Sequence, residues 1–300
     1  MSGKYEDMRI TLPVTGRNGN LKLSAVMDGD TLKWDSMSIR YGLVDGEGVI
    51  PEETDKQHTH EYDQMVWFLS SDPNDMMNLG AELEIDLGSP VIRHKIAIPS
   101  AICIPKGTVH FSPIVTKVDR PFFYFSISCT KNFSAAVTDA NAVPMVGEWN
   151  KFFGEFSKCI KSLSFSANDP YHYGSARNQS SGGVSTFFEG SSAGVPLTVA
   201  WSTVCQEHRL GPWGADGEYH PHTHQDFDEA LIFFSLDTDN LTELHCSADY
   251  SVGEEGNDQE CYELTKATVM AMRKGTPHLP LLYRNVTAPS VFVTASLHRT

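Results

Sequence analysis

The stretch His222-Thr-His224-Gln-Asp-Phe-Asp-Glu229 has a counterpart in the first half of the chain, His58-Thr-His60-Glu-Tyr-Asp-Gln64. The two align when one residue is inserted after the second histidine. About fifty residues later, a Lys-Gly-Thr turn followed by a histidine occurs in both halves, ending at His110 and at His278. Two separate motifs that recur in the same order indicate an internal duplication.

The spacing of each His-x-His pair is that of two ligands on one strand. Side chains alternate faces along a β-strand, so residues i and i+2 present two imidazoles to the same cavity. Gln64 keeps the parity of His58 and His60 and is expected to face the same interior. The histidine after the glycine turn begins a returning strand, because glycine permits the tight geometry there.

Glu229 does not keep the parity of the second pair, His222 and His224. It reaches the same cavity only through a bulge or bend, which the extra residue in the second copy supplies. Asp228 does keep the parity and is the alternative ligand. The residues expected to hold metal are His58, His60, Gln64 and His110 in the first copy and His222, His224, Glu229 and His278 in the second.

Short β-branched and aromatic segments, separated by Gly, Pro, Asp and Ser, predict an all-β chain of sandwich or barrel type. One segment differs: aromatic and aliphatic residues recur at helical spacing over 147–163 and predict an amphipathic helix. We therefore expect an N-terminal barrel over 1–145, a linking helix over 146–165 and a C-terminal barrel over 166–300.

Composition excludes several classes of function. The chain has 300 residues, with 23 Lys and Arg against 38 Asp and Glu, a net charge of −15 and no basic run, so a nucleic-acid partner is not expected. It has no apolar run of the roughly 18 residues that a membrane span needs, and its first residues do not resemble a secretory signal. We expect a cytoplasmic protein without a membrane partner.

Two further patterns carry no site. Six scattered cysteines without a CxxC pair indicate neither a disulfide framework nor a zinc knuckle. The string Gly190-Ser-Ser-Ala-Gly194 fits GxSxG, but a proline and a strand pattern follow it where a nucleophile elbow needs a helix. A serine hydrolase is not expected.

Both halves resemble the cupin superfamily, whose two motifs have the form G(x)5HxH(x)3–4E(x)6G and G(x)5PxG(x)2H(x)3N. The second half matches all four metal-binding positions, although Arg273 replaces the proline of the second motif. In the first half Pro105-Lys-Gly107 matches PxG, and Gln64 stands where glutamate is expected. The resemblance implies two tandem double-stranded β-helix (jelly-roll) barrels, a bicupin, and allows a homodimer.

Replacement of a carboxylate by Gln64 removes one negative charge from the first site. Affinity for hard divalent ions should fall there, and the N-terminal barrel either still holds a metal or is a degenerate structural copy. Three histidines and a glutamate in the second site suit Mn, Fe, Ni, Co or Zn, because no thiolate is involved.

The resemblance implies a metal-dependent enzyme that acts on a small oxygen-rich molecule of β-dicarbonyl, enediol or phenolic type. Dioxygenase-like C–C cleavage is favoured, and hydrolysis, isomerisation and decarboxylation are the alternative reactions. His220 shares the parity of His222 and is a candidate acid or base near neutral pH. A non-catalytic binding or storage protein is the alternative class.

Overall fold

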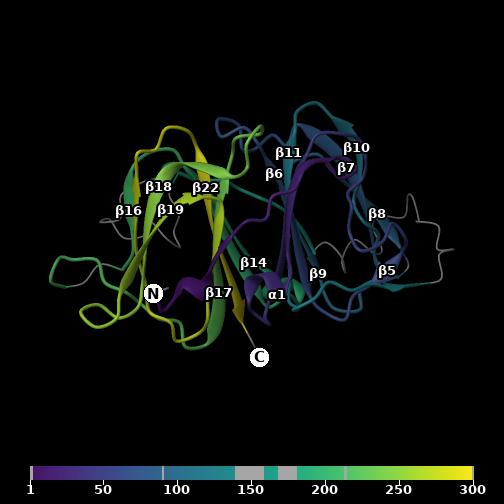
Figure 1. Cartoon of the computed structure of the whole chain (residues 1–300). Coiled ribbons are helices and arrows are strands. Elements are labelled where there is room, and N and C mark those ends of the chain that lie inside the picture. Colours follow the sequence, from purple (N-terminus) through teal and green to yellow (C-terminus); the bar gives the residue numbers. More distant parts are fainter. Residues whose placement is uncertain (1–2, 90, 139–158, 168–180, 213–214, 299–300) are drawn as a thin grey trace.

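Two β-barrels, each a sandwich of two sheets, lie side by side in the structure, a computed structural model (Figure 1). It describes residues 3–89, 91–138, 159–167, 181–212 and 215–298. The all-β fold of two tandem barrels expected from the sequence is confirmed. The described residues contain no helix long and apolar enough to cross a membrane.

The N-terminal barrel has a six-stranded and a four-stranded antiparallel sheet, and a short strand pair beside them. The six-stranded sheet is ordered β13 (Ile160–Ser162), β9 (Ser100–Ile104), β6 (Gln64–Ser70), β11 (Phe122–Ser128), β3 (Ser38–Val44) and β2 (Leu21–Met27). The other strands are β4 (Gly48–Val49), β10 (Ile114–Val118), β7 (Ala81–Leu87) and β8 (Ile92–Ile96), with β12 (Ala136–Val137) paired to β5 (His58–Thr59).

The C-terminal barrel repeats this plan. Its six-stranded sheet is ordered β1 (Arg9–Thr11), β20 (Thr268–Met272), β17 (Phe227–Ser235), β22 (Ser290–His298), β15 (Leu197–Val204) and β14 (Gly182–Glu189). Its four-stranded sheet is ordered β16 (His208–Leu210), β21 (His278–Arg284), β18 (Glu243–Val252) and β19 (Glu260–Lys266).

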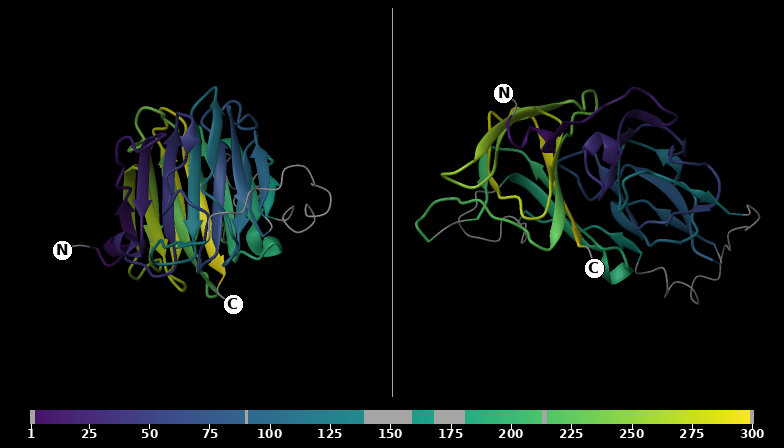
Figure 2. Two further views of the ribbon diagram at one scale, coloured as in Figure 1. Left: turned by 90° about the vertical axis from the view of Figure 1, so that its right-hand side faces the viewer. Right: turned by 60° about the horizontal axis from the view of Figure 1, so that its bottom comes forward.

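The two six-stranded sheets pack against each other, so both faces of each are buried (Figure 2). Strand β6 shows the reason: Met65 and Trp67 join the core that both barrels share, whereas Val66 and Phe68 face the interior of the N-terminal barrel. The central strands are therefore continuous apolar runs rather than alternating ones.

One aromatic contact crosses the interface directly. The ring of Tyr41, on β3, stacks on that of Phe234, on β17, with 3.8 Å between centroids, and its hydroxyl donates to the carbonyl oxygen of Ser235 at 3.1 Å. Full burial of an aromatic side chain of this size contributes about 2–3 kcal/mol. One apolar core therefore spans the interface between the barrels, and the N-terminal barrel has a second core in its interior.

Among the described residues, helical structure is confined to short segments: α1 (Gly29–Leu32) and the 3₁₀ turns η1 (Glu6–Met8) and η2 (Gly190–Ala193). Most of the helix expected over 147–163 lies outside the described residues. Its last part was wrongly predicted, because Ile160–Ser162 forms strand β13. Pairing of β13 with the edge of β9 satisfies backbone groups that would otherwise stay open, and this tertiary pairing overrides the local helical pattern.

Two short strands bear on the expected domain boundaries. Arg9–Thr11, near the start of the chain, pairs with β20 of the C-terminal barrel, and Figure 1 shows this purple segment against the green and yellow strands. β13, from the expected linker, pairs with β9 of the N-terminal barrel. The division at 145 and 165 stays a prediction.

Candidate metal centres

The same backbone frame places three histidines in each barrel. His58 and His110 exchange two backbone hydrogen bonds of 2.9 Å, and His222 and His278 exchange two of 3.0 Å. The glycine of each Lys-Gly-Thr turn then donates to the carbonyl oxygen of the second histidine of the His-x-His pair, at 2.8 Å in the first copy and 2.7 Å in the second. The repeated sequence therefore produces the same local geometry twice.

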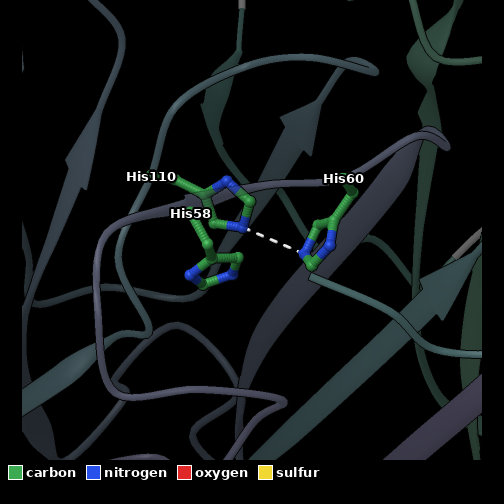
Figure 3. Close-up of side chains that lie close together, drawn as sticks. All are labelled: His58, His60 and His110. Carbon is green, nitrogen blue, oxygen red and sulfur yellow. Dashed lines mark hydrogen bonds between the residues drawn. The ribbon is translucent and has the colours of Figure 1, made fainter. Parts of the chain in front are cut away.

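In the N-terminal barrel, the rings of His58, His60 and His110 lie close together (Figure 3). Each Nδ1 atom lies near a backbone carbonyl oxygen, at 2.7 Å from that of Lys56, 2.6 Å from that of Ser134 and 2.9 Å from that of Thr108, respectively. A carbonyl only accepts, so each Nδ1 carries the proton and each neutral ring keeps its lone pair on Nε2.

The Nε2 atoms of His60 and His110 are 3.2 Å apart. Two lone pairs that face each other at this distance repel unless a proton or a cation lies between them. Burial lowers the pKa of His110 to about 3 and also lowers that of His60, so protonation is unfavourable near neutral pH. The donor set therefore fits a metal ion that accepts both lone pairs, because Zn²⁺–imidazole bonds of about 2.0–2.1 Å allow this separation.

Gln64 is the first residue of β6 and is fully buried. Its Nε2 donates to the hydroxyl of Ser126 at 2.9 Å, and its Oε1 is buried without a hydrogen-bond partner among the described residues. An amide whose nitrogen is engaged and whose oxygen is unpartnered offers that oxygen to a cation.

In the C-terminal barrel, the Nε2 atoms of His222 and His224 are 3.0 Å apart. Glu229 Oε2 lies 3.2 Å from Nε2 of His278 and 3.5 Å from Nε2 of His224, and its Oε1 accepts from Ser296 at 3.1 Å. Burial alone would raise the pKa of the Glu229 carboxyl, but its contacts with His224 and His278 hold it well below its usual range. Three imidazoles and one carboxylate thus converge.

Asp228, the alternative ligand, has other partners. Its Oδ1 accepts from the backbone nitrogen of Lys274 at 3.0 Å and its Oδ2 from the hydroxyl of Ser36 at 2.7 Å. Asp63 accepts from the backbone nitrogen of Lys106 in the same way at 2.8 Å. Asp228 is therefore the equivalent of Asp63, a residue that caps the glycine turn, and Glu229 is the equivalent of Gln64.

The two centres differ in exposure. His58 and His110 are completely buried and His60 is 2% exposed, whereas the side chain of His224 is 23% exposed and His222 is half-buried. Phe227 stacks on His224 with 4.3 Å between ring centroids. Solvent therefore reaches the C-terminal centre along the His224 side.

His220 lies outside both histidine clusters. Its Nε2 contacts Asp216 at 2.8 Å and its Nδ1 contacts Glu255 at 2.8 Å. These hydrogen bonds raise the pKa of His220. Both ring nitrogens are engaged by carboxylates, and an acid–base role stays a prediction.

Sequence reasoning missed Tyr250, which lies in the wall of the C-terminal centre. It is fully buried, its ring lies 6.5 Å from that of His278, and its hydroxyl has no hydrogen-bond partner among the described residues. Burial, together with the charge of Glu229, raises its pKa well above 10. The hydroxyl therefore stays protonated and can donate a hydrogen bond. No motif contains Tyr250, so only the fold identifies it.

No protein-family model matches the chain, and no curated protein matches it in sequence. Solved structures do. The oxalate decarboxylase of Bacillus subtilis at pH 4.6 superposes with a TM-score of 0.60 at 12% identity, over 99% of this chain and 77% of that one. The formate complex of the Lactobacillus farciminis oxalate decarboxylase gives 0.59 at 10%, over 97% and 86%.

A further structure of the Bacillus subtilis enzyme, described for its Mn(II) centres, matches with a TM-score of 0.59 at 11% identity, over 100% of this chain and 78% of that one. These neighbours are bicupins, and the likeness shows that the present chain has their fold. The expectation of a divalent transition metal agrees with those Mn(II) centres and with the two histidine triads.

Proposed function

We propose that the chain is a divalent-metal-dependent enzyme of the cupin superfamily, with its active centre in the C-terminal barrel. The observation that carries this proposal is the convergence of His222, His224, His278 and Glu229 on one accessible point. Pure storage does not require four convergent ligands. Three imidazoles and one carboxylate together suit Mn, Fe, Co, Ni or Zn.

A bound ion would act as a Lewis acid that polarises substrate oxygens. The chain's own residues orient the metal ligands. Ser296 holds the Glu229 carboxylate by its Oε1, and the carbonyl of Thr276 holds the His278 ring by its Nδ1 at 2.9 Å. The Tyr250 hydroxyl is the donor available to a substrate oxygen. The hydrogen bonds of Ser296 and Thr276 to the two ligands fix the orientation of those ligands and raise their basicity.

We propose a small organic acid as the substrate and decarboxylation as the reaction. The fold shared with the oxalate decarboxylases supports this choice. In such a step the C–C bond to one carboxylate breaks, CO₂ leaves, and a proton is added to the remaining carbon.

Dioxygenase-like C–C cleavage of an uncharged dicarbonyl or phenolic compound is the second candidate. The Phe227 ring favours it, because this ring stacks on the metal-binding candidate His224 with 4.3 Å between centroids. An apolar ring beside the centre suits an uncharged substrate better than a dianion.

One experiment separates these candidates. The purified protein is demetallated, reloaded with Mn²⁺ or Fe²⁺, and incubated with oxalate, a β-dicarbonyl and a catechol, with and without O₂. Release of CO₂ without stoichiometric O₂ uptake supports decarboxylation, and one O₂ consumed per product supports dioxygenation. Turnover that survives verified metal removal would eliminate both.

A further inference from the structure

The N-terminal centre lacks the carboxylate that Glu229 gives the C-terminal one. Three neutral imidazoles and the amide of Gln64 carry no negative charge, and their side chains are at most 2% exposed. A divalent ion there would keep its full charge in a buried site, which is costly unless an anionic group lies nearby. An anionic group for the N-terminal centre therefore has to come from a residue outside the His-x-His and glycine-turn motifs.

Glu52, in the loop between β4 and β5, lies beside His58, one of the three histidines. One carboxylate oxygen of Glu52, one of Glu53 and a ring nitrogen of His58 lie within 4.8 Å of one another. Oε2 of Glu52 and Nε2 of His58 are both buried without a hydrogen-bond partner among the described residues. An unpartnered buried oxygen and an unpartnered buried nitrogen, one on each of two neighbouring side chains, indicate a missing cation.

Glu53 already has its counter-charge. Its two oxygens accept from the Arg40 guanidinium at 2.9 and 3.1 Å, in a pair whose side chains are only 10% and 11% exposed. Glu52 forms no ion pair with any residue in the described part of the chain. Its charge is therefore the one left to balance an ion at the histidines.

Strand β11 holds both Glu52 and Gln64 in place. The Tyr124 hydroxyl donates to Glu52 Oε1 at 2.6 Å, and the Ser126 hydroxyl accepts from Gln64 Nε2 at 2.9 Å. Residues 124 and 126 are two apart on one strand and so share a face. Because Tyr124 fixes Oε1, the orientation of Oε2 is set as well.

The second copy has no such hydroxyl. Tyr124 pairs with Phe68 across the sheet, and in the other barrel the residue at the place of Phe68 is Phe233, which pairs with Phe292. Phe292 therefore stands where Tyr124 does and cannot hold a carboxylate. The tyrosine–glutamate pair is present in the copy that lost the motif glutamate.

We propose that Glu52 supplies the carboxylate of the N-terminal metal centre, in place of the one that Gln64 lacks. With Glu52, each centre has three imidazoles and one carboxylate charge, and both bind a divalent ion. The proposal concerns metal binding by the first copy and is independent of turnover at the second.

The test uses the full chain with the substitutions His222→Ala and His224→Ala, which leave only the N-terminal centre. Mn²⁺ and Co²⁺ are titrated into demetallated protein, and the stoichiometry and Kd are measured by calorimetry. We expect one ion per chain. Glu52→Gln should weaken binding about 10–100-fold, the cost of losing a ligand or its close support.

Adding Gln64→Glu to Glu52→Gln moves the charge back to the motif position and should restore the Kd to within about threefold of the parent. Glu61→Gln is the matched control, because Glu61 follows His60 directly but its side chain is 79% exposed. It should leave the Kd unchanged. Circular dichroism checks that each variant is folded.

Three results would overturn the proposal: no ion bound by the parent, an unchanged Kd in folded Glu52→Gln, or no rescue in the folded double variant. Should Glu52→Gln not fold, Tyr124→Phe replaces it. This variant keeps the carboxylates of Glu52 and Glu53 and removes only the hydroxyl that donates to Glu52. A Kd weakened about threefold to tenfold would then support the proposal, and an unchanged one would reject it.

Discussion

The two histidine centres share a backbone and differ in their side chains. Each is built on a His–His backbone bridge and a capped glycine turn, yet one is closed around an amide and the other is open around a carboxylate. The frame thus places the imidazoles, while the fourth group and the solvent access set what each centre can do. The two copies therefore differ at positions that the frame leaves free.

The largest expected effect comes from removing one triad at a time. His222→Ala with His224→Ala should lower kcat/KM at least about 1000-fold, because the ion and its Lewis-acid role are lost. His58→Ala with His60→Ala should lower it less than about tenfold while removing one ion per chain. Initial rates and elemental analysis measure both. The reverse pattern would transfer the active centre to the N-terminal barrel.

Glu229→Gln makes the second centre a chemical copy of the first. We expect metal affinity at the C-terminal centre to fall about 10–100-fold, since Glu229 is the carboxylate that contacts His224 and His278. Asp228→Asn is the control and should change the Kd less than about threefold. Equal losses in the two variants would mean that the ligand assignment at 228 and 229 is wrong. Titration with Mn²⁺ gives both values.

His208 has no histidine counterpart in the first copy. It pairs with Tyr283, which corresponds to Val115 in the N-terminal barrel, and the residue that pairs with Val115 is Gly48. Burial lowers the pKa of His208 to about 4. A lowered native pKa means that the unfolded state binds the proton first, so stability falls as the pH drops from about 6.5 toward 4.

The free energy of unfolding of His208→Phe, relative to that of the parent, should therefore be about 2 kcal/mol higher at pH 5 than at pH 7. Urea unfolding of demetallated protein at the two pH values measures this difference. A difference that does not change with pH would show that His208 titrates normally.

Tyr250 is a further difference between the two barrels, because the equivalent residue in the first copy is Ile85. Tyr250→Phe removes a buried hydroxyl without a partner among the described residues and should leave the Tm equal or higher. A hydroxyl that donates to substrate should cost about threefold to tenfold in kcat/KM. An unchanged kcat/KM with a changed Tm would assign Tyr250 a structural role only.

The smallest expected effect concerns His220, whose side chain is 35% exposed. Because Asp216 and Glu255 engage both ring nitrogens, we expect His220→Gln to keep kcat/KM within about twofold. A loss of tenfold or more, together with a shifted pH profile, would instead establish the acid–base role that its position in the sequence predicts.

The chain's own sequence determined the duplication, the all-β class and the eight motif positions, because histidines two apart on a strand and a glycine turn are local features. It also ranked Glu229 above Asp228, since the extra residue in the second copy implied a bend. Only the tertiary structure showed that Ile160–Ser162 is a strand and that Arg9–Thr11 joins the far barrel. Those outcomes depend on which sheet edges need a partner.

Glu52 and Tyr250 show the same division most clearly. Neither belongs to a motif, and Glu52 comes to His58 only because a loop folds over the barrel and Tyr124 holds the carboxylate there. Periodicity reports which face of one strand a residue occupies. It carries no information on which distant loop or strand completes that face, because those contacts are settled by the packing of the two sheets.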